Sequence, residues 1–280
     1  MGSDSRLLFQ APISGDYLIR VDDSQGAGGP TAGYALTLRP AIPDFKVRLT
    51  GAPTAVARGS GQGFSISLDR LDGFEGAVEV EFLHLPPGWS VSHPVRIEAG
   101  HESANLTLNA VTEAQQPDDA MWDAVRVVAS AKIDHRAVAV EVNRLGRPRL
   151  LAETPKLLVS LEPSGVQTNV SSTTVPIRPG STAQARLKIQ RNGFEGVVVF
   201  SLENLPHGVI VENLGLNGIT FLPEENEREI SFAAAPWVGE LERPFHAVES
   251  QAGRQTSRPL VLQVRRPPAA LTAESRNAQE

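Results

Sequence analysis

An internal repeat runs through most of this sequence. The tetrapeptide Gly-Phe-Glu-Gly stands at residues 73–76 and returns 120 positions later at residues 193–196. Twelve positions after the start of each copy comes the pattern Leu-Pro-x-Gly, at residues 85–88 and 205–208. Two four-residue patterns at one shared spacing make chance a poor explanation. Self-similarity over such a distance indicates that one folding unit occurs twice in the chain.

Apolar and polar residues alternate inside both copies. Phe64, Ile66 and Leu68 alternate with serines, and the same period of two recurs elsewhere. The aligned segments are 64–68 with 185–189, 78–82 with 198–202, 106–108 with 230–232, and 138–142 with 260–264. Because successive strand residues point to opposite faces, this period predicts strands with one buried face. About seven to nine short strands per copy predict an all-β chain of tandem β-sandwiches.

The repeated motifs are expected to be folding devices. Gly73 and Gly193 each follow a polar strand end, where a turn with positive φ favours glycine. In Leu-Pro-x-Gly the proline ends strand pairing, and the glycine permits the chain to reverse. A binding surface built from the same motifs is the alternative that the sequence leaves open.

Composition excludes several classes of protein. With 41% hydrophobic and 21% charged residues, the chain is neither globally disordered nor dominated by membrane segments. No apolar run approaches the roughly 20 residues of a spanning helix, so no membrane span is expected. A net charge of -6 argues against a nucleic-acid binder, which must neutralise phosphates. The lack of cysteine removes disulfides, thiolate metal sites and a cysteine nucleophile.

Residues 1–40 lie outside the repeat and have a pattern of their own. Apolar runs at 7–9, 17–21 and 34–38 predict three strands. The segment resembles the C-terminal half of the bacterial pre-peptidase C-terminal domain on Phe9-x-Ala11-Pro12, Gly15-Asp16-Tyr17-x-Ile19-Arg20-Val21 and Tyr34-x-Leu36-x-Leu38. That resemblance implies a partial jelly-roll-like β-domain of a secreted protein. Since the family's earlier strands have no counterpart here and no signal peptide is visible, we expect a fragment.

The two repeat copies resemble the bacterial Ig-like modules that follow such domains in large secreted or surface proteins. The matching motifs are Gly-Phe-x-Gly and Leu-Pro-x-Gly, and the resemblance covers most of residues 45–266. It implies one Ig-like sandwich at 41–148 and a second at 149–266. Residues 267–280 lack core-forming periodicity and are expected to form a flexible tail.

Motifs for catalysis are absent from the sequence. None of the six histidines forms HExxH or lies near a GxSxG nucleophile elbow. Equivalent positions in the two copies do not share a histidine, as His84 aligns with Asn204 and His207 with Pro87. We therefore expect no enzyme, with neither catalytic nor cofactor-binding residues. Hydrolase activity from dispersed residues stays as an alternative.

Two acidic clusters are the candidates for a metal site. Asp22 and Asp23 border a Gly-rich loop, and Asp118 and Asp119, with Asp123 nearby, are expected in a long loop. Carboxylates on loops supply the oxygen ligands that Ca²⁺ prefers, although neither cluster has the DxDxDG spacing of a calcium loop. No cofactor is therefore expected, with calcium at these residues as the alternative to acidic, solvated turns.

Trp89, Trp122 and Trp237 could supply a stacking platform for a glycan, and the first two are the candidates. Trp89 follows the Leu-Pro-Pro-Gly turn and Trp122 lies in the acidic loop, so both are expected to be partly exposed. The flat apolar face of an exposed indole can pack on a sugar ring. Core or rim packing is the alternative.

Taken together, these features predict a non-catalytic array of modules. It would act as a spacer or protein-binding segment of an exported bacterial multidomain protein, at a secreted, cell-surface or periplasmic location. The expected partners are other domains of the same parent protein or cell-surface proteins, and neither nucleic acid nor a membrane span is involved. A carbohydrate-binding accessory module of a secreted hydrolase, with polysaccharide as its ligand, is the alternative.

Overall fold

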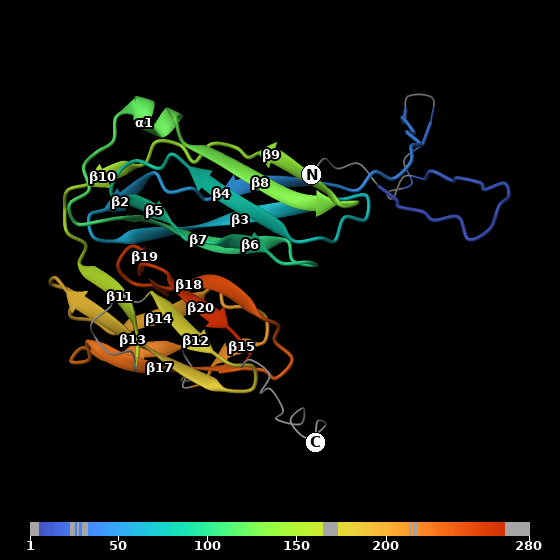
Figure 1. Cartoon of the computed structure of the whole chain (residues 1–280). Helices are drawn as coiled ribbons and strands as arrows, with labels where there is room; N and C mark the ends of the chain where they lie inside the picture. The colour runs from blue at the N-terminus through green and yellow to red at the C-terminus, as the bar shows by residue number, and fades with distance from the viewer. Residues whose placement is uncertain are drawn as a thin grey trace, which may run out of the picture.

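The computed structural model describes residues 6–22, 26, 28–29, 33–164, 173–212, 214 and 218–266. These residues form two β-sandwiches that lie one against the other (Figure 1). We call residues 44–151 the first sandwich and residues 157–264 the second sandwich. The segment before Asp44 projects to one side of the first sandwich.

Two antiparallel sheets face each other in the first sandwich. One sheet has the order β1-β3-β7-β5, and the other has the order β6-β4-β8-β9. The short strands β2 and β10 form a parallel pair. The elements are β1 (Asp44–Thr50), β2 (Ala55–Ala57), β3 (Gly61–Leu71), β4 (Val78–Leu83), β5 (Trp89–Val91), β6 (Val95–Ile97), β7 (Ser103–Ala110), α1 (Asp119–Asp123), β8 (Arg126–Ile133), β9 (Arg136–Glu141) and β10 (Arg149–Leu151).

The second sandwich repeats this arrangement. Its sheets have the orders β11-β13-β17-β15 and β16-β14-β18-β20-β12, with β12 parallel to β20. The strands are β11 (Leu157–Pro163), β12 (Thr174–Ile177), β13 (Thr182–Arg191), β14 (Val198–Glu203), β15 (Val209–Val211), β16 (Ile219–Phe221), β17 (Glu227–Ala234), β18 (Leu241–Glu249), β19 (Gln255–Thr256) and β20 (Leu260–Val264). The segments aligned in the sequence occupy equivalent places as β3 and β13, β4 and β14, β7 and β17, and β9 and β20. The prediction of an all-β chain of tandem Ig-like sandwiches is confirmed.

Each sandwich encloses a hydrophobic core of its own. In β1, Phe45, Val47 and Leu49 are buried while the residues between them are exposed, as the alternation predicts. Full burial of a side chain of this size contributes roughly 1.5–3 kcal/mol, so the alternation decides which face of the strand turns inward. Phe45 is also joined by Phe74 of the first Gly-Phe-Glu-Gly motif, with ring centroids 5.4 Å apart.

The Gly-Phe-Glu-Gly motif forms the same turn in both sandwiches. Gly73 has a φ of 83° and Gly193 has a φ of 90°, so the predicted positive φ is confirmed at both positions. The strand before each turn carries an arginine at or next to its last position, and this arginine binds the last carbonyl of the motif. The Nη1 of Arg70 donates to the oxygen of Gly76, and the Nη1 of Arg191 donates to that of Gly196, both at 2.7 Å.

The described part of residues 6–43 contains no strand. The strands expected at 7–9, 17–21 and 34–38 are not formed, because these runs pair with no sheet of the two sandwiches and their apolar side chains stay exposed. The segment is attached at Asp72, which pairs with Arg6 and Arg39 and accepts a hydrogen bond from the backbone N–H of Ile42 at 3.1 Å. Arg39, the Ile42 N–H and Arg6 lower the pKa of Asp72 to about 2.

Part of the long loop expected around residues 118–123 is the short helix α1. The side chain of Asp118 caps its N-terminus by accepting from the backbone N–H of Met121 at 2.8 Å. Arg147 pairs with Asp119 at 2.6 Å and with Asp123 at 2.7 Å. These contacts attach the helix to the segment that leads out of the first sandwich.

Candidate functional site: the contact between the two sandwiches

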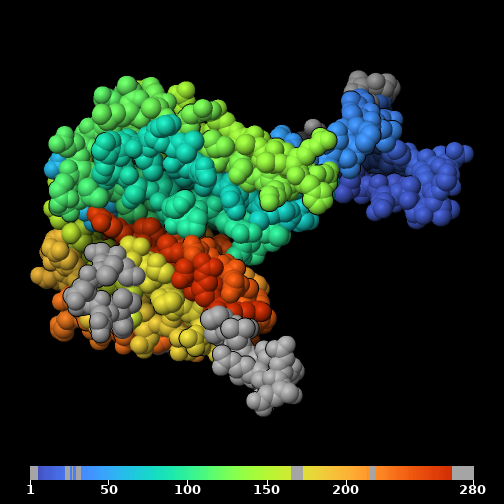
Figure 2. All heavy atoms as spheres, in the orientation of Figure 1, coloured from blue at the N-terminus to red at the C-terminus, as the bar shows by residue number. Residues whose placement is uncertain are grey.

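A sheet of the first sandwich continues into the second sandwich. Strand β19 pairs with β18 on one side and with β3 on the other, with Gln255 opposite Gln62 and Thr256 opposite Gly61. Strand β1 pairs only with residues 65–71 of β3, so β19 takes the part of β3 that β1 leaves open. Figure 2 shows the C-terminal strands of the second sandwich, in red, packed against the first sandwich.

Buried polar residues gather at this contact, whereas the two sandwich cores are apolar. In the described part of the chain, the buried polar residues come either from Ser60 and the β5–β7 region of the first sandwich or from the β18–β19 region of the second. They are Ser60, Ser92, Thr107, Asn109, Arg243, His246, Glu249, Gln255, Thr256 and Ser257. Buried polar groups must find partners to offset their lost hydration, so a contact rich in them has a specific geometry.

Hydrogen bonds between side chains cross the contact. The hydroxyl of Ser60 donates to Oε1 of Gln255 at 2.5 Å, and the hydroxyls of Thr107 and Thr256 bond to each other. The amide of Gln62 donates to the backbone oxygen of Gly253 at 3.0 Å. Net contributions of about 0.5–1.5 kcal/mol per bond are usual for such pairs.

Gly61 permits this close approach. A Cβ added there would lie 2.3 Å from Oδ1 of Asn109 and 2.4 Å from Oγ1 of Thr256. Neither distance leaves room for a methyl group, so a larger residue at position 61 would force the side chains of Asn109 and Thr256 to move.

An ion pair also joins the two sandwiches. Nη1 of Arg243, on β18, lies 2.9 Å from Oε1 of Glu98, which follows β6. The side chain of Arg243 is only 11% exposed, and its guanidinium also donates to Oδ1 of Asn204. Burial of the arginine with two partners holds the ends of the sandwiches in one orientation.

Glu249 organises the turn that carries β19. One of its carboxylate oxygens accepts from the backbone N–H groups of Gln251 and Ala252, at 2.7 and 2.6 Å, and the other accepts from that of Gln255 at 2.7 Å. The buried carboxylate thereby fixes the shape of the segment that reaches the first sandwich.

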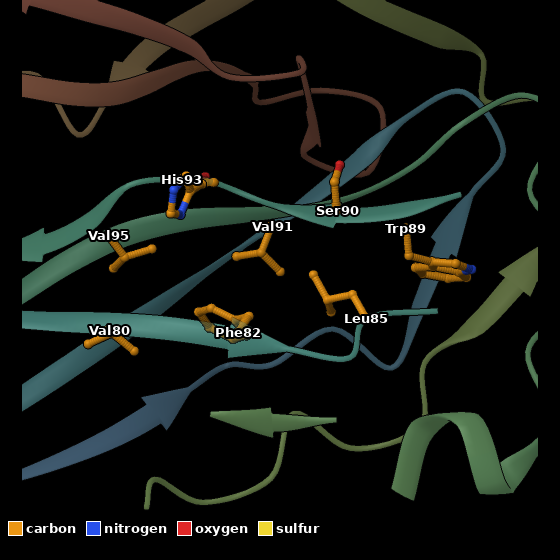
Figure 3. Close-up of a pocket in the computed structure, with 9 residues that line it drawn as sticks. Val80, Phe82, Leu85, Trp89, Ser90, Val91, His93 and Val95 are labelled. Carbon is orange, nitrogen blue, oxygen red and sulfur yellow. The ribbon is translucent and has the colours of Figure 1, made fainter. Parts of the chain in front are cut away.

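Two cavities lie near these strands. One, of about 450 Å³, lies between the sandwiches and is lined by residues of both, with Glu203 and Arg254 as its charged groups. The other, of about 170 Å³, lies between β4 and β5 and is lined mainly by Val80, Phe82, Leu85, Trp89 and Val91 (Figure 3). His93 is the titratable group of that lining. Ser90 and Ser92 also line the smaller cavity, but among the described residues neither hydroxyl bonds to His93, and Ser92 Oγ accepts from the backbone N–H of Thr107 at 3.0 Å.

The acidic candidates for calcium lie apart and take part in other contacts. Asp22 pairs with Arg20 at 2.6 Å, and Asp23 lies outside the described residues. Asp118 caps α1 and Asp119 pairs with Arg147, as described above. Across the part of the chain that the structure describes, no group of three or more His, Cys, Asp or Glu side chains is placed to hold a metal ion. Calcium binding at these residues stays the alternative to the expected absence of a cofactor.

The expected partial exposure of Trp89 and Trp122 is wrong. Their exposed fractions are 6% and 3%, and their rings meet edge to face with centroids 4.9 Å apart. Burial covers both faces of these indoles because α1 brings Trp122 onto the sandwich beside the Leu-Pro-Pro-Gly turn, so they offer no stacking surface to a sugar. The exposed tryptophan is Trp237, at 60%.

The contact itself escaped the sequence reasoning. The residues concerned are 243–249 of β18, all of which are buried in the structure. Phe245 and Ala247 enter the core of the second sandwich, so the residues between them must be covered by something outside that core. Pro244 and His246 alternate with core residues in this strand, and its amino-acid composition does not indicate which surface covers them.

Among the described residues, no helix has the length and apolar character needed to cross a membrane.

Comparison with known proteins identifies no family. No family model matches the chain, and no curated protein matches it. Solved structures with a similar arrangement include the D0-D1 domain of intimin, at 14% identity and a TM-score of 0.28, covering 78% of this chain and 97% of that one. Domains 5-6 of the S-layer protein SbsC match at 14% identity and a TM-score of 0.26, covering 80% and 98%.

Fibronectin(III)-like modules of Clostridium thermocellum CbhA are a further match. The identity is 13% and the TM-score is 0.21, with 78% of this chain and 92% of that chain covered. Scores at this level carry no functional argument, and the sandwich architecture rests on the strands and cores described above.

Proposed function

We propose that this chain is a non-catalytic structural segment in which two Ig-like sandwiches act as one rigid spacer. The observation that carries the proposal is the pairing of β19 with β3, which makes a sheet of one sandwich continuous with a sheet of the other. Two modules joined only by a linker would move freely, whereas a shared sheet with buried hydrogen bonds holds one orientation.

The proposal places the chain in an exported bacterial multidomain protein, at the cell surface or secreted. Its support is the sequence resemblance to bacterial Ig-like modules. We assign the modules to residues 41–148 and 149–266, with 1–40 as a separate N-terminal piece and 267–280 as a tail. Other domains of the parent protein or cell-surface proteins are the partners that such a spacer would hold in place.

The absence of catalysis is part of the same proposal. Its support is the use that the described polar residues make of one another: Arg243 pairs with Glu98, Glu249 binds backbone N–H groups, and Arg147 pairs with the acids of α1. Groups that are committed to such contacts hold the fold together and are not free to act on a substrate.

A distance measurement between the sandwiches tests the proposal. The chain has no cysteine, so the double variant Glu79→Cys, Ser160→Cys places one spin label on an exposed position of each sandwich. Pulsed electron paramagnetic resonance at neutral pH is expected to give one narrow distance distribution. A broad distribution that narrows only on crowding or binding would show a flexible tether and overturn the proposal.

A matched control separates motion of the sandwiches from motion of the labels. The pair Lys46→Cys, Glu79→Cys places both labels on the first sandwich alone, at exposed positions on its two different sheets. Its distribution sets the width that label motion contributes by itself. The pair that spans the contact should be no wider than this control.

A further inference from the structure

His246 lies on the face of β18 that is turned toward the first sandwich. Its neighbours Phe245 and Ala247 belong to the core of the second sandwich, and successive strand residues point to opposite faces. Val248, on the same face as His246, lines the cavity between the sandwiches together with Phe64 and Asn105 of the first sandwich. The imidazole is therefore enclosed by the contact and not by the core.

The imidazole is fully buried and without a hydrogen bond. Its exposed fraction is 0%, and neither Nδ1 nor Nε2 has a hydrogen-bond partner among the described residues. The nearest charge is the carboxylate of Glu203, with Oε2 at 3.9 Å from Nε2. The other oxygen of that carboxylate lies 3.8 Å from Nη2 of the exposed Arg254, so Glu203 is shared between a buried and an exposed base.

The other charged side chains of β18 have partners of their own, Glu242 pairing with Arg265 at 2.6 Å. Arg243 pairs with Glu98 from the end of β6, and Glu249 accepts backbone N–H groups of its own turn. Two further imidazoles, those of His101 and His207, meet between the sandwiches with ring centroids 6.1 Å apart. The β3 and β7 residues of the first sandwich that are buried in the contact are uncharged, Thr107 and Asn109 among them. Burial, in surroundings that supply one shared carboxylate, lowers the pKa of His246 to about 4.

We propose that the contact between the sandwiches is an acid-sensitive joint, in which protonation of His246 favours separation of the second sandwich from the first. The proposal rests on the rigid pairing proposed above and adds a condition under which it is released. Residues 152–156, which connect β10 to β11 outside either sheet, are the segment about which the sandwiches would separate.

Proton linkage gives the sign and the size of the effect. In the separated state water reaches the imidazole, whose ordinary pKa is 6.5, whereas in the closed state the pKa is about 4. The separated state therefore binds more protons between these values, and falling pH favours it. Between about pH 7.5 and about pH 5, the ratio of separated to closed molecules is expected to rise about 25-fold.

Thiol labelling measures this ratio even where the separated state is rare. In the variant Thr256→Cys, the new thiol replaces a fully buried hydroxyl of the contact, in a chain with no other cysteine. Its rate with 4,4′-dithiodipyridine is divided at each pH by the rate of the exposed thiol of Ser160→Cys, which removes the thiol's own pH dependence. The normalised rate is expected to rise about 25-fold between about pH 7.5 and about pH 5.

Three controls make the result specific. Adding His246→Leu to Thr256→Cys should leave the normalised rate within about twofold across the same range, because the imidazole is gone. Adding His101→Asn, which removes the imidazole that meets His207 of the second sandwich, should leave the 25-fold rise intact. Ala185→Cys places a thiol in the core of the second sandwich, and its slow labelling should not follow that of Thr256→Cys.

The possible results separate the two proposals. A Thr256→Cys thiol that reacts as fast as the exposed thiol at neutral pH would overturn the rigid pairing itself. A slow rate without a pH-dependent rise, a rise that persists in His246→Leu, or a rise shared by Ala185→Cys would overturn the acid-sensitive joint alone. Should His246→Leu open the contact at neutral pH, NMR titration of the His246 ring decides, since separation must follow the protonation of that ring.

Discussion

At the scale of single residues, the two sandwiches meet through small and short polar side chains. Gly61, Thr107 and Thr256 bring their backbones close, while Ser60 and Gln255 bond across the gap. Each sandwich has an apolar core of its own, and the buried contact between them contains few large apolar side chains, Val248 among them. An interface of this composition depends on fit more than on apolar area, so single added atoms should matter.

Gly61→Ala tests that dependence. The added methyl group would collide with Asn109 and Thr256, and relief requires these side chains to give up their present positions and the hydroxyl bond between Thr256 and Thr107. We expect a loss of about 1–3 kcal/mol in the free energy of unfolding, measured by urea denaturation, and faster labelling of the Thr256→Cys thiol.

Gly63→Ala is the matched control on the same strand. A Cβ there would meet Thr256 Cγ2 at 3.7 Å, an ordinary contact, and the backbone is not in the left-handed region. Its stability should stay within about 0.5 kcal/mol of the parent chain. Equal losses in the two glycine variants would contradict the assigned role of Gly61.

At the scale of elements, the repeated motif recurs because its backbone carbonyls bind an arginine side chain near the end of the preceding strand. Arg70, next to the end of β3, and Arg191, at the end of β13, bind backbone carbonyls of the Gly-Phe-Glu-Gly motif and of a neighbouring loop. Arg70 also lies over the ring of Phe74, with its Cζ atom 5.4 Å from the ring centroid. The motif thus recurs because each sandwich closes the same corner in the same way.

Arg70→Met and Arg191→Met should each destabilise the sandwich that contains them. Each change keeps much of the apolar stem and leaves carbonyl groups without a charged donor. The expected loss is about 1–3 kcal/mol per variant, measured by thermal or urea unfolding. Arg96→Met, at an exposed position of β6, is the control and should change the stability by less than about 0.5 kcal/mol.

The elements also show how far the sequence could lead. Strands such as β1 and β3 were predictable because one face is buried and the other wet, so their residues alternate. The burial of Trp122 was not, because it depends on α1, a helix of five residues held by Asp118 and Arg147 from outside its own span. The strands expected before Asp44 had the right alternation but lacked a sheet to join.

At the scale of the whole molecule, the decisive property is the continuity of a sheet through both sandwiches. Sequence patterns indicate which residues are buried but not which part of the protein buries them. Only the structure therefore shows that the first sandwich packs over the face of β18 that carries Pro244 and His246. If the sandwiches move as one body, the chain transmits orientation between whatever precedes and follows it. If the sandwiches move independently, the chain limits only the distance between those neighbouring parts and not their orientation.

Residual dipolar couplings of backbone N–H groups measure this property most directly. Couplings from the first and the second sandwich, fitted separately at neutral pH, are predicted to give alignment tensors of the same magnitude and orientation in the frame of the structure. Tensors that differ in magnitude, or whose axes require another arrangement of the two sandwiches, would contradict the rigid pair on which this account rests.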